Sequence, residues 1–196
     1  LIQSHEKLVK YVDLPLQHVS SRVLRAMRRP GDYDSTVKLI KKIREMIPGV
    51  TIRSSFIVGF PGETEEDFQE LLSFLKQMRL DHVGIFKYSQ EEDTSAYNLT
   101  QQIPEEEKER RYKTAMELQQ EISCQLNQEL VGREIDVIID GVSDESDLVL
   151  VGRHAGQAPD VDGVVYLGQC NVEIGQIVKV RIVEAHPYDL VGEVVE

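Results

Sequence analysis

Residues 57–68 constrain the fold of this chain more than any other stretch. They begin with the β-branched pair Ile57 and Val58, pass through a Gly-Phe-Pro-Gly turn and continue into an acidic helical pattern. Thr64 and Asp67 have the spacing of a capping box, in which each side chain accepts a hydrogen bond from the other residue's backbone. Buried strand, glycine turn and capped helix in this order are typical of α/β folds, which bind ligands where strands end. The alternative is an ordinary strand-to-helix connection without a ligand.

Strand and helix patterns alternate along the first part of the chain. The predicted elements are a strand at 11–16, a short helix capped by Ser20 or Ser21, a helix with the apolar stripe Val37, Ile40, Ile43 and Ile47, a strand at 50–58, a helix after Thr64 and a strand at 82–89. Such alternation indicates βα units on a parallel sheet.

The pattern changes in the second part of the chain. Pro104 and three glutamates begin a long predicted helix. Its apolar stripe consists of Leu118, Ile122, Leu126 and Leu130. After this helix, alternating apolar residues and short apolar runs bounded by Gly, Asp or Pro predict five short strands. Five such strands suggest a small closed barrel of the OB type. We therefore predict an α/β domain at 1–103, a linker helix at 104–130 and an all-β barrel at 131–196.

Charge is distributed unevenly. The chain has a net charge of −12, and residues 128–196 hold 14 of its 34 acidic but only 4 of its 22 basic residues. A surface of this kind repels phosphates and attracts basic partners. The alternative is that the acidic residues only keep a small domain soluble.

Several classes of protein are disfavoured by what the sequence lacks. Its two cysteines, Cys124 and Cys170, are far apart, and its five histidines are scattered, so no metal or cluster site is predicted. No apolar run approaches the roughly 20 residues that cross a bilayer. The first residues do not form a signal peptide and do not begin with Met. We expect a cytoplasmic protein of which this chain is a fragment.

The ends of the predicted parallel strands are the expected ligand site. They lie near Gln17 and His18, at 54–62 and at 86–89, and they offer backbone polar atoms, aromatic faces and small residues. This chemistry suits an adenosine-like ligand, whereas no nucleophile–base pair, carboxylate dyad or Walker loop is present. Lys87 and Arg53 either face the ligand or are ion-paired.

Four motifs carry a resemblance to a known family: Leu14-Pro15-Leu16-Gln17-His18, residues 22–29, residues 56–63 and Phe86-Lys87-Tyr88-Ser89. Together they resemble the second half of the radical S-adenosylmethionine (SAM) domain of the methylthiotransferases. The long helix and the barrel resemble that family's linker and its C-terminal TRAM domain. The resemblance covers essentially the whole chain.

Two motifs resemble the RimO type within this family. They are Pro15-Leu16-Gln17-His18 and the barrel residues 152–153 with 158–166. The RimO type modifies an aspartate of a basic ribosomal small-subunit protein. The acidic barrel agrees with that partner and disfavours the MiaB type, which modifies tRNA. A third hypothesis is a non-catalytic module whose barrel binds a basic protein.

The resemblance implies a partial (βα)₆ barrel with SAM and two 4Fe–4S clusters. One cluster would cleave SAM reductively, the resulting radical would take hydrogen from the aspartate β-carbon, and a methylthio group would be added there. The residues implied to contact SAM are Gln17, Arg53, Ser54, Phe56, Ile57, Val58, Gly59, Phe86, Tyr88 and Ser89. His18 and Lys87 are candidates for the substrate side. The cluster-binding CxxxCxxC motif is absent from this sequence, so we predict that the chain alone is inactive.

Overall fold

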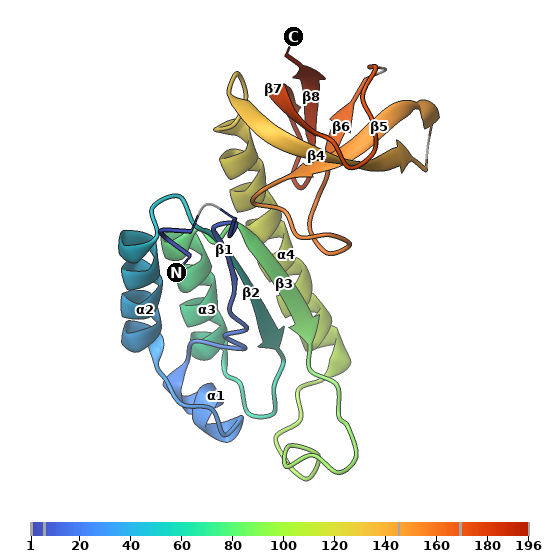
Figure 1. Ribbon diagram of the computed structural model, residues 1–196. Helices are drawn as coiled ribbons and strands as arrows, with labels where there is room; N and C mark the ends of the chain where they lie inside the picture. Colours follow the sequence, from blue (N-terminus) through green and yellow to red (C-terminus); the bar gives the residue numbers. More distant parts are fainter. Residues whose placement is uncertain (1, 6, 145, 169, 196) are drawn as a thin grey trace. The chain divides into compact units, whose positions relative to one another are not determined.

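The computed structural model describes residues 2–5, 7–144, 146–168 and 170–195. The chain forms two compact units, Val12–Gln119 and Leu1–Tyr11 together with Gln120–Glu196 (Figure 1). Helix α4 (Glu105–Gln128) contributes to both units. The predicted domain limits at 103/104 and 130/131 stay a prediction.

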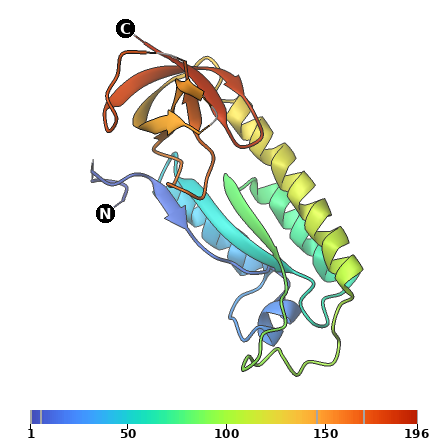
Figure 2. The ribbon, with the colours of Figure 1, turned by 90° about the vertical axis from the view of Figure 1, so that its right-hand side faces the viewer.

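The first unit contains a three-stranded sheet with the order β1-β2-β3 (Figure 2). The strands are β1 (Tyr11–Asp13), β2 (Thr51–Val58) and β3 (His82–Lys87). Strands β2 and β3 run parallel, and beyond the end of β1, Gln17 forms a parallel bridge with Phe56. The predicted βα organisation is confirmed.

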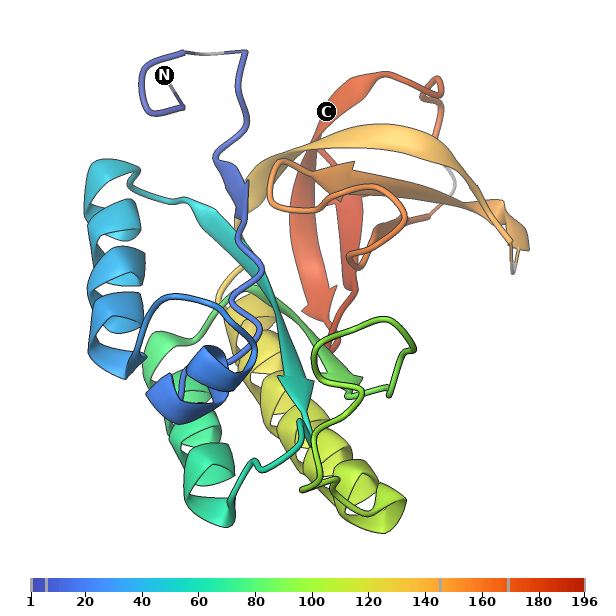
Figure 3. The ribbon, with the colours of Figure 1, turned by 90° about the horizontal axis from the view of Figure 1, so that it is seen from below.

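Helices cover one face of this sheet, as the view in Figure 3 shows. They are α2 (Tyr33–Met46), α3 (Glu65–Met78) and the first part of α4. Helix α1 (Ser21–Ala26) lies beyond the strand ends, where its Val23 packs with Phe60 and Tyr88. Burial alternates along β2, and the Phe56 ring packs edge-on against Phe74 of α3 at 5.9 Å. The buried residues of β2 therefore face the helices, and Arg53, Ser55 and Ile57 face the other side.

Side-chain caps begin the helices where the sequence predicts them. Ser20 is the N-cap of α1 and accepts a hydrogen bond from the backbone N–H of Val23. Thr64 and Asp67 form both bonds of the predicted capping box at the start of α3. This box fixes where α3 begins, directly after the glycine turn that ends β2.

The second unit contains a closed five-stranded barrel with the order β4-β5-β6-β8-β7. Its strands are β4 (Glu134–Ser143), β5 (Ser146–His154), β6 (Val165–Leu167), β7 (Ile177–Ala185) and β8 (Leu190–Val194). Buried aliphatic side chains fill it: Val137, Ile139, Val165, Leu167, Val180, Ile182 and Leu190. The predicted closed β-barrel is confirmed.

Two elements differ from the prediction. The first strand ends at Asp13 rather than residue 16, because Pro15 has no N–H to donate to a neighbouring strand. The predicted apolar stripe of α4 begins only at Leu118. Ile122 of this stripe is buried, and the structure adds a buried face in the first half of the helix that consists of Lys108, Arg111, Ala115 and Gln119. Leu130 lies beyond the end of α4.

Candidate functional site

A cavity of about 580 Å³ lies where the strands of the α/β unit end. Residues from all three strand ends line it, among them Gln17, Ser55, Ile57, Phe86, Tyr88 and Ser89. Ser55 and Ile57 come from the face of β2 that the helices leave uncovered. The volume falls within the range of roughly 300–1,000 Å³ that is usual for small-molecule sites.

Gln17 holds the first strand end in an unusual conformation. Its φ is +67°, in the left-handed region that non-glycine residues rarely adopt. Two backbone bonds to β2 fix it there: its N–H donates to the Ser55 carbonyl and its carbonyl accepts from the Ile57 N–H, each at 2.8 Å. Strained residues of this kind cluster at binding and active sites.

Replacing Gln17 with glycine is expected to raise the free energy of unfolding by about 0.5–1 kcal/mol relative to Gln17→Ala, because glycine adopts a positive φ without steric cost. Both variants remove the same side chain beyond Cβ, so their difference isolates the backbone effect. Urea denaturation of the two variants measures it. Equal stability would mean that the conformation at Gln17 carries no strain.

The structure brings together six of the predicted site residues: Gln17, Ile57, Phe86, Lys87, Tyr88 and Ser89 line the cavity. The side chains of Ser54, Phe56 and Val58 are instead fully buried on the helix-covered face of β2. The Ser54 hydroxyl donates to the Leu14 carbonyl at 2.8 Å and accepts from the Leu16 N–H at 3.3 Å. Ser54 thus holds the chain after β1 against β2.

Lys87 and Arg53 are both ion-paired. The Lys87 ammonium lies 2.6 Å from Glu105 and 3.0 Å from Glu109 of α4, and these two carboxylates raise its pKa to about 12. Arg53 lies 2.8 Å from Asp13 at the end of β1. Of the two alternatives, facing the ligand or being ion-paired, the structure therefore contains the ion pair for both residues.

His18 is fully buried beside the cavity rather than open to it. Its Nδ1 accepts a hydrogen bond from the Ser20 N–H at 3.0 Å. Burial lowers its pKa to about 3, and the nearby positive charges of Arg111 and Arg22 act in the same direction. His18 is therefore neutral near pH 7, and it supports the start of α1.

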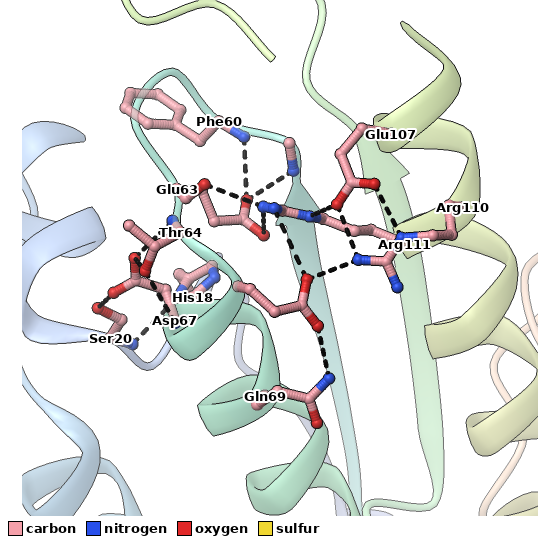
Figure 4. A network of polar contacts seen from close by, with 12 residues as sticks. His18, Ser20, Phe60, Glu63, Thr64, Asp67, Gln69, Glu107, Arg110 and Arg111 are labelled. Carbon is pink, nitrogen blue, oxygen red and sulfur yellow. Dashed lines mark hydrogen bonds and ion pairs between the residues drawn. The ribbon is translucent and has the colours of Figure 1, made fainter. Parts of the chain in front are cut away.

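Glu63 stabilises the glycine turn after β2 (Figure 4). Its Oε2 accepts from the N–H groups of Gly59 at 2.6 Å and Phe60 at 3.0 Å, and its Oε1 lies 2.9 Å from Arg111 of α4. Glu63 is 2 % exposed, and burial raises its pKa although Arg111 acts in the opposite direction. This turn is thus fixed by an internal buried ion pair.

Asp67 joins the start of α3 to α1. It accepts from the Ser20 hydroxyl at 2.5 Å and from the Thr64 N–H and hydroxyl at 2.7 Å each, and it pairs with Arg22. Ser20 and Thr64 are the N-caps of the two helices. One carboxylate therefore fixes both helix starts at the strand ends where the cavity lies.

Sequence reasoning missed the contribution of α4 to the site. Lys108 and Arg111 are 9 % and 5 % exposed. Lys108 donates to the Tyr88 carbonyl just after β3, and Arg111 pairs with Glu63 of the turn that follows β2. The only sequence signal is their recurrence with Ala115 and Gln119 at a spacing of three to four residues, which is that of one helix face.

The structure offers no place for a metal or cluster within the residues that it describes. No group of three or more His, Cys, Asp or Glu side chains in this part of the chain is arranged so that it could hold a metal ion. The thiols of Cys124 and Cys170 are free and half-buried. In the same part of the chain, no helix has the length and apolar character of a membrane span.

Two known domain families match this chain. Residues 2–75 match the Radical SAM superfamily, and residues 131–195 match the TRAM domain. Among solved structures, the radical SAM enzyme coproporphyrinogen III oxidase (HemN) of Escherichia coli aligns with a TM-score of 0.51 at 14 % identity. This alignment covers 76 % of the present chain and 42 % of HemN, and it confirms the fold alone.

Curated relatives extend the similarity to nearly the whole chain. The ribosomal protein uS12 methylthiotransferases RimO of Salmonella paratyphi A (strain ATCC 9150 / SARB42) and Salmonella paratyphi B (strain ATCC BAA-1250 / SPB7) are each 52 % identical over 192 residues. The alignment covers 97 % of this chain but only 43 % of each relative, so the chain spans less than half of their length. The chain is therefore a relative of the RimO-type methylthiotransferases that combines a radical SAM segment with a TRAM domain, as its motifs predicted.

Proposed function

We propose that the cavity at the strand ends of the α/β unit binds SAM, in a protein that adds a methylthio group to an aspartate of ribosomal protein uS12. The observation that carries the proposal is the position of the cavity. It lies at the carboxyl ends of parallel strands, in the unit that matches the Radical SAM superfamily. The similarity to RimO supplies the reaction and the substrate class.

The lining of the cavity suits an adenosine carrying an amino acid. Ile57 offers an aliphatic surface, and the Phe86 ring, which is 55 % exposed, offers a face for a purine. Gln17, Ser55 and Ser89 offer polar groups nearby. Bound SAM would supply the methyl group and the radical chemistry on which this family depends. The buried Ser54, Phe56 and Val58 would support the site by holding β2 against the helices. Arg53 would support it through its ion pair with Asp13, which joins β2 to β1.

The iron–sulfur clusters of the family do not fit this chain. Its two cysteines are too few for the three-cysteine motif, and among the described residues no other group could replace it. We therefore derive no catalytic step from these residues, and we propose methylthio transfer only for the whole protein. We also propose that the reaction takes place in the cytoplasm, because the proposed substrate is a ribosomal protein.

Truncation of the exposed aromatic ring tests the proposed SAM site. Phe86→Ala is expected to weaken binding of S-adenosylhomocysteine about tenfold, since stacking of one base on an aromatic side chain is worth about 1–3 kcal/mol. Isothermal titration calorimetry measures the change. Tyr97→Ala is the control, because Tyr97 is also exposed but does not line the cavity. Equal affinity of Phe86→Ala and the unmodified chain would contradict the assignment.

We further propose that the barrel binds the basic ribosomal protein. A groove of about 630 Å³ on the barrel is lined by Asp140, Asp144, Asp160 and Asp162 together with Arg153. Arg153 lies 3.0 Å from Asp140, and the neighbouring strands pair Lys179 with Asp136 and Arg181 with Glu134. Three of the four basic residues after position 127 are thus neutralised locally, which leaves the excess acidic charge for a cationic partner.

Binding across a salt series distinguishes this proposal from its alternatives. The chain is expected to bind uS12 with an affinity that falls as salt rises, and not to bind tRNA. Asp144→Asn with Asp160→Asn should weaken binding of uS12, whereas Glu193→Gln outside the groove is the matched control. Preferential binding of tRNA would favour the MiaB type. Binding of uS12 without any binding of S-adenosylhomocysteine would favour the non-catalytic module.

A further inference from the structure

We propose that Lys108 of α4 is a positioning residue for the cavity, because it holds the ends of β2 and β3 in their relative places. The inference rests on the proposed function, since it concerns the affinity of the same site for SAM. Lys108 does not line the cavity. It acts through the residues that follow the two strands, Gly59 and Tyr88.

The ammonium group of Lys108 fixes the end of β3. Its Nζ donates to the Tyr88 carbonyl at 3.1 Å and lies 5.4 Å from the centre of the Tyr88 ring. Tyr88 lines the cavity, and its ring packs edge-on against Phe60 at 5.2 Å. Because the bond is buried and its donor is charged, it restrains Tyr88 more strongly than an exposed bond would.

The aliphatic part of the same side chain packs on the end of β2. A Cβ atom at Gly59 would lie only 2.4 Å from Lys108 Cγ, and Gly59 has a φ of +74°. The glycine of this turn therefore makes room for a side chain of α4. The resemblance implies a contact of Gly59 with SAM, and the side of Gly59 on which a Cβ would stand is filled by Lys108.

Each strand end carries an amide that reports on its position. The Tyr88 N–H donates to the Val58 carbonyl at 2.9 Å, and the Gly59 N–H donates to Glu63 at 2.6 Å. If Lys108 positions both ends, its loss frees both amides. The amides of α3, such as that of Phe68, depend on helical bonds and keep their protection.

Lys108→Met is the informative variant, because it keeps an unbranched apolar chain and removes only the ammonium. Lys113→Met is the matched control on the same helix, with a side chain that is 65 % exposed. We expect Lys108→Met to speed hydrogen exchange at Tyr88, whose carbonyl loses its buried donor, without changing it at Phe68. Lys108→Ala also removes the aliphatic part of the side chain, so it should speed exchange at Gly59 as well. We also expect Lys108→Met to weaken S-adenosylhomocysteine binding on the order of tenfold, a typical size for coupling between distant groups. Lys113→Met should change neither quantity.

The exchange measurement keeps the inference separate from the proposed function. Faster exchange at Tyr88 in Lys108→Met, and at Gly59 as well in Lys108→Ala, in a chain that binds no S-adenosylhomocysteine would support positioning by Lys108 and refute the ligand. Unchanged exchange at Tyr88 in Lys108→Met, or at Gly59 in Lys108→Ala, would overturn the inference, whatever the ligand does. Faster exchange throughout α3 would also overturn it, since Lys108 would then contribute only to global stability.

Discussion

Arg111→Met is expected to lower the free energy of unfolding of the α/β unit by about 3–5 kcal/mol, the usual cost of removing one partner of a buried ion pair. Arg111 is 5 % exposed, lies 2.9 Å from Glu63 and donates to the Glu63 carbonyl at 3.1 Å. Its loss leaves the Glu63 carboxylate buried without its cation. Urea denaturation followed by circular dichroism measures the change.

Two further variants identify the cause of this loss. Arg110→Met, one position earlier, removes an arginine that is 46 % exposed in its side chain and should cost at most about 1 kcal/mol. Adding Glu63→Gln to Arg111→Met should recover part of the lost stability, because the uncompensated charge is gone. A double variant no more stable than Arg111→Met would show that lost packing against Phe68, rather than charge, dominates.

The same pair has a consequence for the pH dependence of stability. Burial raises the pKa of Glu63 above its ordinary 4.5, so the folded unit keeps a proton that the unfolded chain has already lost. The free energy of unfolding therefore falls as pH rises from 4.5 through the raised pKa of Glu63 in the folded unit. His18 acts in the opposite sense: its pKa of about 3 makes stability fall as pH drops below about 6.5. The contribution of Glu63 is therefore obtained by measuring the free energy of unfolding against pH for Glu63→Gln and for the unmodified chain and subtracting the two curves. Removing Arg111 raises the pKa of Glu63 further, so the deficit of Arg111→Met should shrink in acid.

Much of the fold follows from local sequence patterns. Alternation at 135–139 and 178–183 predicted barrel strands, and Thr64 with Asp67 predicted the start of α3, since these signals come from period and spacing alone. The two faces of β2 could not be told apart in this way. Ile52 and Phe56 alternate with Arg53 and Ile57, and a strand of a parallel sheet is apolar on both faces. The resemblance implied SAM contacts for Ser54 and Phe56, and only the structure shows that their side chains face the helices.

The contribution of α4 was hidden for a different reason. Lys and Arg are almost never fully buried unless paired. Both residues have an acidic partner one turn earlier on α4, Glu105 and Glu107. Their contacts with the surroundings of the cavity are instead to Tyr88 and Glu63, which are 20 and 48 positions away in the sequence. A pairing over such distances leaves no local pattern. The sequence could therefore predict the helix but not the residues through which it supports the cavity.

Gly163→Ala is expected to destabilise the barrel by about 3 kcal/mol or more, because its new methyl group has no space. A Cβ at Gly163 would lie 1.9 Å from the Tyr188 carbonyl oxygen, and a backbone atom cannot move aside as a flexible side chain can. The segment before β6, which contains Gly163, here passes close to the segment before β8, which contains Tyr188. One residue further along the first segment, the Val164 carbonyl accepts a hydrogen bond from the Leu190 N–H of β8 at 2.9 Å. Displacing Tyr188 therefore opens the barrel beside Leu190, which belongs to its buried core.

Hydrogen exchange measured separately over the two units tests this expectation. Amides of β6 and β8 should lose protection in Gly163→Ala, whereas those of β2 and α3 should keep it, because the clash lies entirely within the barrel unit. Gly141→Ala is the control, since a Cβ at Gly141 meets no atom within 4 Å. Gly163 also lines the acidic groove, so the variant should bind uS12 more weakly while its affinity for S-adenosylhomocysteine stays unchanged. Loss of both affinities would mean that the two sites depend on one cooperative fold rather than on two units with separate roles.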